Sequence, residues 1–171
     1  MNKSIVLKRV VSFVLLLACM VVIFLMSAQK GDESTDTSNG VVYYVAKIFV
    51  KDFANMSLPE QQDIMNSMSG FIRTAGHFCE FAALGFLSLN ALLTFELQFW
   101  KKALFSFLFS VFYAITDEIH QYFVPDRVCD IKDVLVDSLG AATGIAFFTV
   151  CFLTFARFRS RKNDTQDNTV G

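Results

Sequence analysis

Ionisable side chains recur at helical spacing in three stretches of an otherwise apolar chain. The first stretch holds Arg73, His77 and Glu80, which lie four and three residues apart and therefore share one face of a helix. An imidazole beside a carboxylate suits proton transfer near neutral pH, because histidine titrates there. The guanidinium adds a group that suits the phosphate or carboxylate of a bound molecule.

The second and third stretches are richer in acids. Their side chains are Asp117, Glu118, His120 and Gln121 in the second stretch, and Asp130, Asp133 and Asp137 in the third. A charged side chain that faces lipid costs about 2.5–3.5 kcal/mol at the centre of a membrane, so such residues are functional candidates. We therefore expect the three faces to meet in an inward-facing polar pocket.

Four apolar segments must position these side chains, over residues 10–28, 74–94, 103–122 and 132–155. Each approaches the roughly 20 residues that a helix needs to cross a bilayer. The chain is 54% hydrophobic and has a mean hydropathy of +0.46. A soluble domain of 171 residues has too small an interior to bury that much apolar surface. The sequence predicts an all-α integral membrane protein, a bundle of four transmembrane helices.

Between the first two apolar segments the chain is mostly polar. Apolar residues recur there at helical spacing over 41–49 and 64–72. Ser57 followed by Glu60, with Pro59 between them, is typical of a helix start. We predict amphipathic extracytoplasmic helices that lie on the membrane surface or cap the bundle.

Basic residues around the short connections set the expected orientation. One side of the membrane receives Lys3, Lys8, Arg9, Lys101, Lys102, Arg157, Arg159, Arg161 and Lys162. The positive-inside bias then makes both termini cytoplasmic and the protein a multi-pass plasma-membrane protein. Residues 1–156 would form the membrane domain and residues 157–171 a basic, polar cytoplasmic tail. All three ionisable faces would lie at the extracytoplasmic end.

Small residues predict how the helices approach one another. Ser106, Ser110 and Ala114 form a ridge whose helical phase continues to Asp117 and Gln121. On the last apolar segment, residues 140 and 144 are both glycine, on the face that also holds residues 133 and 137. Small residues mark close helix contacts in membranes. Packing and charge therefore predict the same inward faces.

Three blocks of the sequence resemble the signature blocks of the VanZ-like family of bacterial membrane proteins. They are FIRTAGHFCEFAALG at 71–85, TDEIHQYFVPDR at 116–127 and DVLVDSLGA at 133–141, and residues 26–29 fit more loosely. The similarity covers about residues 10–155. It implies a four-helix protein of the cell envelope, in a family whose founding member is associated with low-level teicoplanin resistance. One departure is Asp126, where the family usually has glycine before the arginine.

The residues and the resemblance together give the predicted site. The candidates for catalytic roles are Glu80, Asp117, Asp137, His77 and His120, and the candidates for substrate contacts are Arg73, Glu118, Gln121, Arg127 and Asp133. Ser27 and Gln29, at the outer end of the first apolar segment, would add hydrogen bonds. Helix bundles can bind metals through paired Glu-x-x-His motifs, but this spacing alone does not define a ligand set, so no metal and no cofactor are assigned.

The leading functional hypothesis is an envelope protein whose outward-facing pocket binds or modifies a lipid-linked or cell-wall component and lowers teicoplanin susceptibility. Whether it is an enzyme stays open. The alternatives are a small transporter or proton-coupled membrane protein, and a non-catalytic membrane interaction subunit that uses residues 40–72. The bilayer is the expected partner. Nucleic acid is not, because the chain has no basic tract with interleaved aromatic residues.

Overall fold

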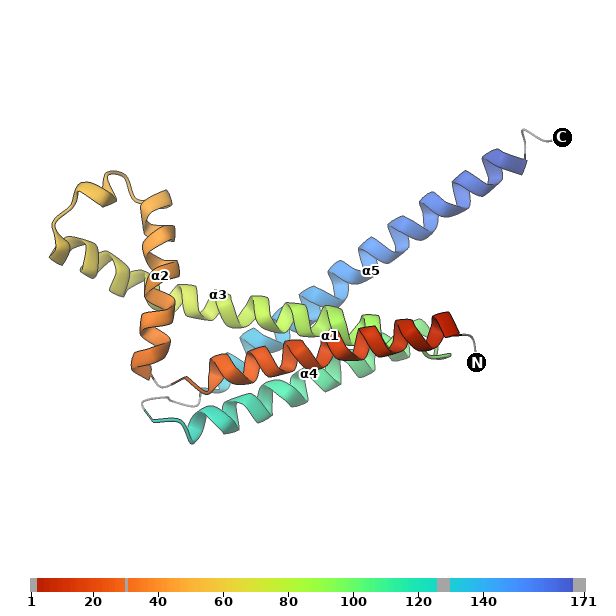
Figure 1. Cartoon of the computed structure of the whole chain (residues 1–171), viewed down its shortest axis with the longest axis horizontal. Helices are drawn as coiled ribbons and strands as arrows, with labels where there is room; N and C mark the ends of the chain where they lie inside the picture. The colour runs from red at the N-terminus through yellow and green to blue at the C-terminus, as the bar shows by residue number, and fades with distance from the viewer. Residues whose placement is uncertain (1–2, 30, 126–129, 168–171) are drawn as a thin grey trace.

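The computed structural model describes residues 3–29, 31–125 and 130–167, and their side chains except over 31–38 and 160–167. This part of the chain is helical and contains no strand. Its elements are α1 (Lys3–Ser27), α2 (Gly31–Phe49), the 3₁₀ turn η1 (Phe53–Asn55), α3 (Leu58–Leu92), α4 (Phe99–Tyr122) and α5 (Ile131–Asp167) (Figure 1).

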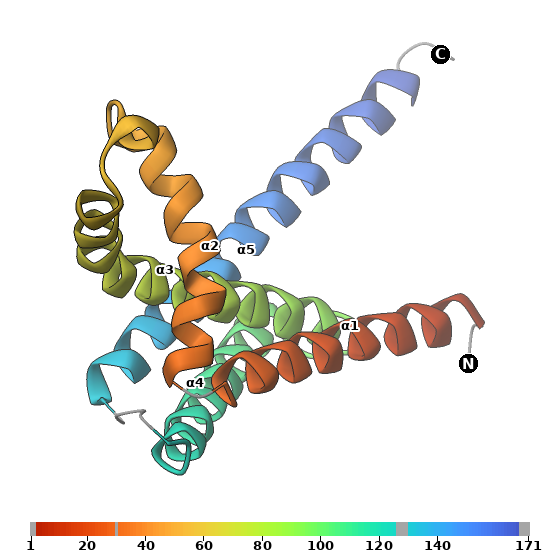
Figure 2. The ribbon, with the colours of Figure 1, turned by 60° about the vertical axis from the view of Figure 1, so that its left-hand side comes forward.

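Helix α3 is the centre of the bundle. It packs against α1, α2, α4 and α5, and its contact with α5 is the most extensive. Helices α1, α3 and α4 run side by side, α2 crosses near one end, and the C-terminal part of α5 extends away from the others (Figures 1 and 2). The loop after α3 lies beside the start of α1, so these two helices are antiparallel.

The helices of the bundle bury small polar side chains and expose large apolar ones. Helix α1 buries Ser12 and Ser27, whereas Leu17 and Leu25 are 61% and 58% exposed. Helix α4 shows the same reversal, since it buries every residue of the ridge predicted at 106, 110 and 114 and exposes Leu108 and Phe112 between them. This arrangement suits a lipid surround, in which apolar surface gains nothing from being buried in protein.

Three described helices are long and apolar enough to cross a membrane: Lys3–Ser27, Phe99–Tyr122 and Ile131–Arg159. The expected span at 74–94 is not among them. It lies in α3, whose partners cover it on several sides. A helix shielded in this way does not need the all-round apolar surface of a lipid-exposed span, so hydropathy is a weak guide to it. The count of four spans therefore stays a prediction.

Glycines allow α5 to lie directly on α3. A Cβ atom on Gly140 would collide with the carbonyl oxygen of Phe78, and one on Gly144 would collide with that of Ala82. From the other side, a Cβ on Gly85 would collide with the carbonyl oxygen of Ala141. The glycine pair predicted to mark a close contact does so, and the contact lies on the face that carries Asp137.

Helix boundaries differ from the predicted segments in two places. The helix start at Ser57 is confirmed, because the backbone nitrogen and hydroxyl of Ser57 both donate to Glu60 Oε2, over 2.9 and 2.7 Å. That helix continues without a break to Leu92, so the surface segment and the predicted second span form one helix. Helix α5 likewise continues to Asp167, because residues 145–167 include neither glycine nor proline.

Helix α2 packs on α3 with residues other than those of its predicted apolar face. Val42 and Ala46 are fully buried, and α2 packs on α3. Val41, Ile48 and Phe49, which belong to the predicted apolar face, are 54%, 75% and 79% exposed. Helix α2 therefore has apolar residues on both its inner and its outer side.

Candidate functional site

Asp117 is the best-supported acid of the predicted site. It is 4% exposed, on the inner face of α4. Its Oδ2 accepts a hydrogen bond of 2.8 Å from the Ser27 hydroxyl, at the end of α1, and another of 2.8 Å from Gln121 Nε2, one turn along α4. Gln121 Nε2 also reaches the Ser27 hydroxyl, at 3.4 Å. The hydrogen-bonding role predicted for Ser27 is thus confirmed.

Asp137 is buried in a different way. Its side chain is fully buried on α5, and neither carboxylate oxygen accepts a hydrogen bond from the described residues. His77 of α3 lies opposite, with its Nδ1 3.7 Å from Asp137 Oδ1 and its side chain 15% exposed. This distance permits an ion pair when the imidazole is protonated but exceeds that of a hydrogen bond.

Other acids surround Asp137. Asp117, Glu118, Asp133 and Glu80 are close enough for their charges to act on it. Glu118 is 2% exposed, and its Oε2 accepts a hydrogen bond of 3.1 Å from the backbone nitrogen of Asp130. Asp133 and Glu80 are half-buried. We call these five residues the acid cluster: Glu80, Asp117, Glu118, Asp133 and Asp137.

Three predicted residues lie outside this arrangement. Arg73 is exposed on α3. His120 stacks on the ring of Phe24, with centroids 4.5 Å apart, and its buried Nε2 has no hydrogen-bond partner in the described chain. Asp130, expected to continue the stripe of acids on α5, instead uses its carboxylate to accept the backbone nitrogen of Lys132 at the start of that helix. Arg127 lies outside the described residues.

Tyr113 is a neighbour of the acid cluster that the sequence analysis did not single out. Its hydroxyl donates to the backbone carbonyl of Met20 over 2.7 Å, which joins α4 to α1. Its charge interacts with that of Asp117 when both are ionised. The sequence feature that indicates this position is the spacing of four residues between Tyr113 and Asp117, which places both on the same side of α4.

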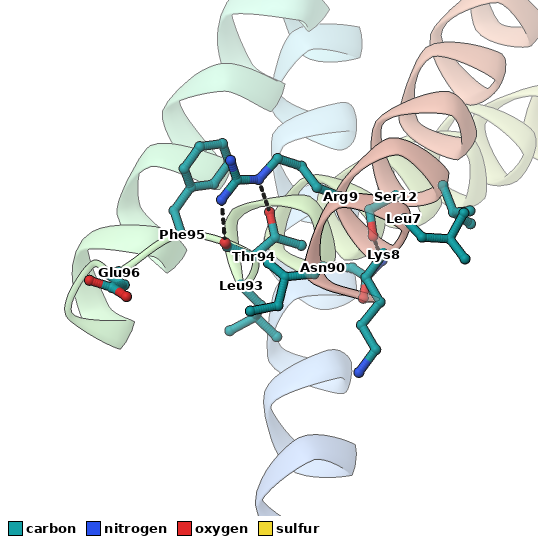
Figure 3. A pocket seen from close by; sticks show the side chains of 11 residues that line it. Leu7, Lys8, Arg9, Ser12, Asn90, Leu93, Thr94, Phe95 and Glu96 are labelled. Atoms are coloured by element: carbon teal, nitrogen blue, oxygen red, sulfur yellow. Dashed lines mark hydrogen bonds between the residues drawn. The ribbon is translucent and has the colours of Figure 1, made fainter. Parts of the chain in front are cut away.

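The opposite end of the bundle carries a second polar arrangement, which we call the Arg9 clasp. Arg9 Nη2 donates to the carbonyl of Thr94 over 2.8 Å, and its guanidinium carbon lies 4.2 Å from the ring centroid of Phe95 (Figure 3). Asn90 donates to the Ser12 hydroxyl over 3.1 Å. A cavity of about 950 Å³ lies beside these residues, and neither it nor a smaller apolar groove between α3 and α5 is lined by the acid cluster.

The fold and the site together show which class of protein this chain belongs to. The chain is a helical membrane protein, with apolar faces that contact lipid and a cluster of buried acids at one end. The model of the VanZ/LLP1 family matches residues 12–154, and the chain belongs to this family. The match includes every residue of the acid cluster as well as Ser27, His77 and Gln121.

Comparisons with curated proteins and with solved structures found no match.

Proposed function

We propose that this VanZ/LLP1 family member is a cell-envelope membrane protein whose acid cluster binds or modifies a lipid-linked or cell-wall component and thereby lowers teicoplanin susceptibility. The observation that carries this proposal is the burial of Asp137 without a hydrogen-bond donor among the described residues, next to His77 and Asp117. A purely structural polar network tends to satisfy its buried groups, as Asp117 is satisfied. An incompletely satisfied carboxylate among other acids is a feature of functional sites.

The acid cluster would lie on the extracytoplasmic side. The antiparallel order of α1 and α3 brings the basic N-terminal residues of the chain to the end that holds the Arg9 clasp. The loop between α3 and α4, with Lys101 and Lys102 just after it, belongs to the same end. The positive-inside bias assigns this end to the cytoplasm, and the acid cluster, at the other ends of these helices, to the outside.

Helix α2 would lie at the outer membrane surface. It runs crosswise to α1 (Figure 1), as a helix in the plane of the interface would. Its inner side packs on α3 through Val42 and Ala46, while Ile48 and Phe49 project outward. Such an exposed apolar side can insert among lipid headgroups. A lipid-linked substrate in the outer leaflet would then reach the acid cluster beside this helix.

Glycopeptide susceptibility tests the proposal directly. The chain is expressed in a susceptible Gram-positive host, and the minimal inhibitory concentrations of teicoplanin and vancomycin are measured for wild type and for Asp117→Asn. Asparagine keeps the shape of the side chain and an oxygen that can accept from Ser27 or Gln121, so the variant should insert and fold. We expect wild type to raise teicoplanin tolerance selectively and Asp117→Asn to lose that effect.

Asp63→Asn is the matched control, because it neutralises an exposed acid on α3. It should retain full tolerance at equal membrane abundance. If wild type raises no tolerance, the resistance part of the proposal is wrong. Solute or proton flux through liposomes containing the purified protein would instead support the transporter alternative.

A further inference from the structure

We infer that His77, Asp117 and Asp137 form a binding site for a divalent transition-metal cation. Each residue offers one ligand atom, and these atoms lie within 4.8 Å of one another. Ligands that share an ion at bond lengths of about 2.0–2.2 Å stand roughly 3–4 Å apart, so small side-chain movements would complete the site. The three residues come from α3, α4 and α5, and the packing of these helices holds them together.

Asp137 provides an independent reason to expect a cation. Its side chain is fully buried, its Oδ1 faces His77 Nδ1 at 3.7 Å, and neither oxygen accepts a hydrogen bond within the described residues. Buried carboxylates in native proteins normally have donors, because an unsatisfied charged group loses its hydration without compensation. A metal ion at this point would satisfy the carboxylate directly, and the imidazole would become its neighbouring ligand.

The surrounding charges favour a cation over any other ligand. Four carboxylates act electrostatically on Asp137, those of Asp117, Glu118, Asp133 and Glu80. Among the described residues, His77 lies at ion-pair distance from Asp137, and its imidazole is charged only when protonated. Metal binding would reduce the repulsion among the acids. It requires a neutral imidazole, so a protonated His77 would release its proton when the metal ion binds.

Hydrogen bonds already orient one of the ligands. Ser27 and Gln121 both donate to Oδ2 of Asp117, each over 2.8 Å. Outer donors of this kind fix a ligating carboxylate in position and are a regular part of metal sites. Ser27, from α1, thereby brings the fourth helix of the bundle into support of the site.

The donor set indicates the class of metal. One imidazole nitrogen and two carboxylate oxygens suit ions such as Zn²⁺ and Mn²⁺, since imidazole favours the first and carboxylates favour the second. Three protein ligands leave a coordination position for water or for an oxygen of a bound molecule, as in catalytic zinc sites. The inference rests on the proposed function in one respect, namely that the acid cluster has a functional role and does not serve helix packing alone.

Metal binding is tested on the purified full chain. The protein in detergent is stripped with EDTA and titrated with Zn²⁺ and, separately, with Mn²⁺ by calorimetry, and ion content is measured after gel filtration. We expect about one ion per chain and a rise in the thermal unfolding midpoint on binding. His77→Gln and Asp137→Asn should each weaken binding at least about tenfold, because each removes a ligand.

Two control variants separate this site from surface binding. His120→Gln removes the other of the two histidines in the chain, which stacks on Phe24, and Asp63→Asn removes an exposed acid on α3. Both should bind the metal like wild type. No binding by wild type, or unchanged binding by His77→Gln and Asp137→Asn, would overturn the inference.

A spectroscopic readout covers the case in which a ligand variant fails to fold. Co²⁺ added to the stripped wild-type protein should give the visible absorption bands of a four- or five-coordinate ion, and Zn²⁺ should displace it. A spectrum of hexahydrated Co²⁺ alone would refute the site. None of these measurements uses a glycopeptide, so a failure of metal binding and a failure of the resistance assay are observed independently.

Discussion

At one end of the bundle Arg9 donates two hydrogen bonds to Thr94 and lies over the ring of Phe95, whereas at the other end Asp137 is buried and accepts no hydrogen bond from the part of the chain that the structure describes. Both groups are ionisable, and Arg9 is half-buried whereas Asp137 is fully buried. The arginine has partners that match its geometry, so the Arg9 clasp is complete within the protein. The carboxylate has an imidazole at 3.7 Å and other acids around it.

This contrast is the reason for proposing a structural role for the Arg9 contact and a functional role for Asp137. A satisfied buried charge holds two helices together and needs nothing further. An unsatisfied one reduces the stability of the folded chain, and such a cost persists at positions that bind something or take part in chemistry. The clearest difference between Arg9 and Asp137 within the described residues is in their hydrogen-bond partners.

The largest expected effect comes from separating the two helices behind the acid cluster. Gly140→Val would drive a side chain into the backbone of Phe78 and push α5 off α3. We expect a loss of about 3 kcal/mol or more, seen as a large fall in the thermal unfolding midpoint, since backbone cannot yield as a side chain does. Gly70→Val, at a position with open space, should change the midpoint little.

Gly140→Val should disrupt the helix packing around the acid cluster and leave the Arg9 clasp intact. Cysteines placed at Ser12 and Asn90, whose side chains are hydrogen-bonded in the Arg9 clasp, should still crosslink in the Gly140→Val background. Zinc binding should be lost in that background. A Gly140→Val protein with the wild-type midpoint would show that the glycine contact is not required for packing.

Replacing the two central acids by leucine should have opposite effects. In metal-free protein, Asp137→Leu should raise stability by about 1–2 kcal/mol, because an apolar side chain of similar shape replaces a buried carboxylate that has no donor among the described residues. Asp117→Leu should lower it by about 1–3 kcal/mol, because Ser27 and Gln121 lose their shared acceptor. Thermal unfolding with EDTA present measures both. Two changes of the same sign would contradict the difference drawn between these acids.

Arg9→Lys tests the other side of the comparison. Lysine keeps the positive charge that sets orientation but cannot form the planar contacts to Thr94 and Phe95, so stability should fall by about 1 kcal/mol. Teicoplanin tolerance at equal abundance should not change. Lys8→Arg, at the exposed neighbouring position, should leave the unfolding midpoint where it is. A loss of tolerance in Arg9→Lys would mean that the clasp also takes part in function.

The smallest expected effect is on the pH dependence of helix content near Glu60, an exposed acid at the start of α3. Hydrogen bonds from the hydroxyl and the backbone nitrogen of Ser57 lower the pKa of Glu60. A lowered pKa contributes stability above the usual glutamate range, and this contribution is lost as pH falls through the lowered value. Circular dichroism should show a small loss of helix at the start of α3 under those conditions. Glu60→Gln should flatten this dependence, and an unchanged acid transition would rule out the contact.

Much of the inward arrangement follows from helical phase. The ridge at Ser106, Ser110 and Ala114 and its continuation to Asp117 and Gln121 are all buried, as their spacing predicts. The glycine contact of α5 is confirmed for the same reason, because period and residue size can be read along a chain. His120, predicted on the same face as Asp117, is half-buried and stacks on Phe24 of α1, the helix whose Ser27 donates to Asp117.

The sequence by itself determined that the chain is helical, that lipid must contact its apolar faces, and which residues carry the VanZ-like pattern. These properties depend on composition and on spacing along one helix. Only the tertiary structure decided that, within the described ranges, Asp117 has hydrogen-bond donors and Asp137 has none, that Arg73 is exposed, and that Arg9 binds the loop after α3 at the opposite end. Whether a buried charged group has hydrogen-bond partners depends on atoms from other helices. The crossing angles that place those atoms cannot be predicted from the periodicity of a single helix.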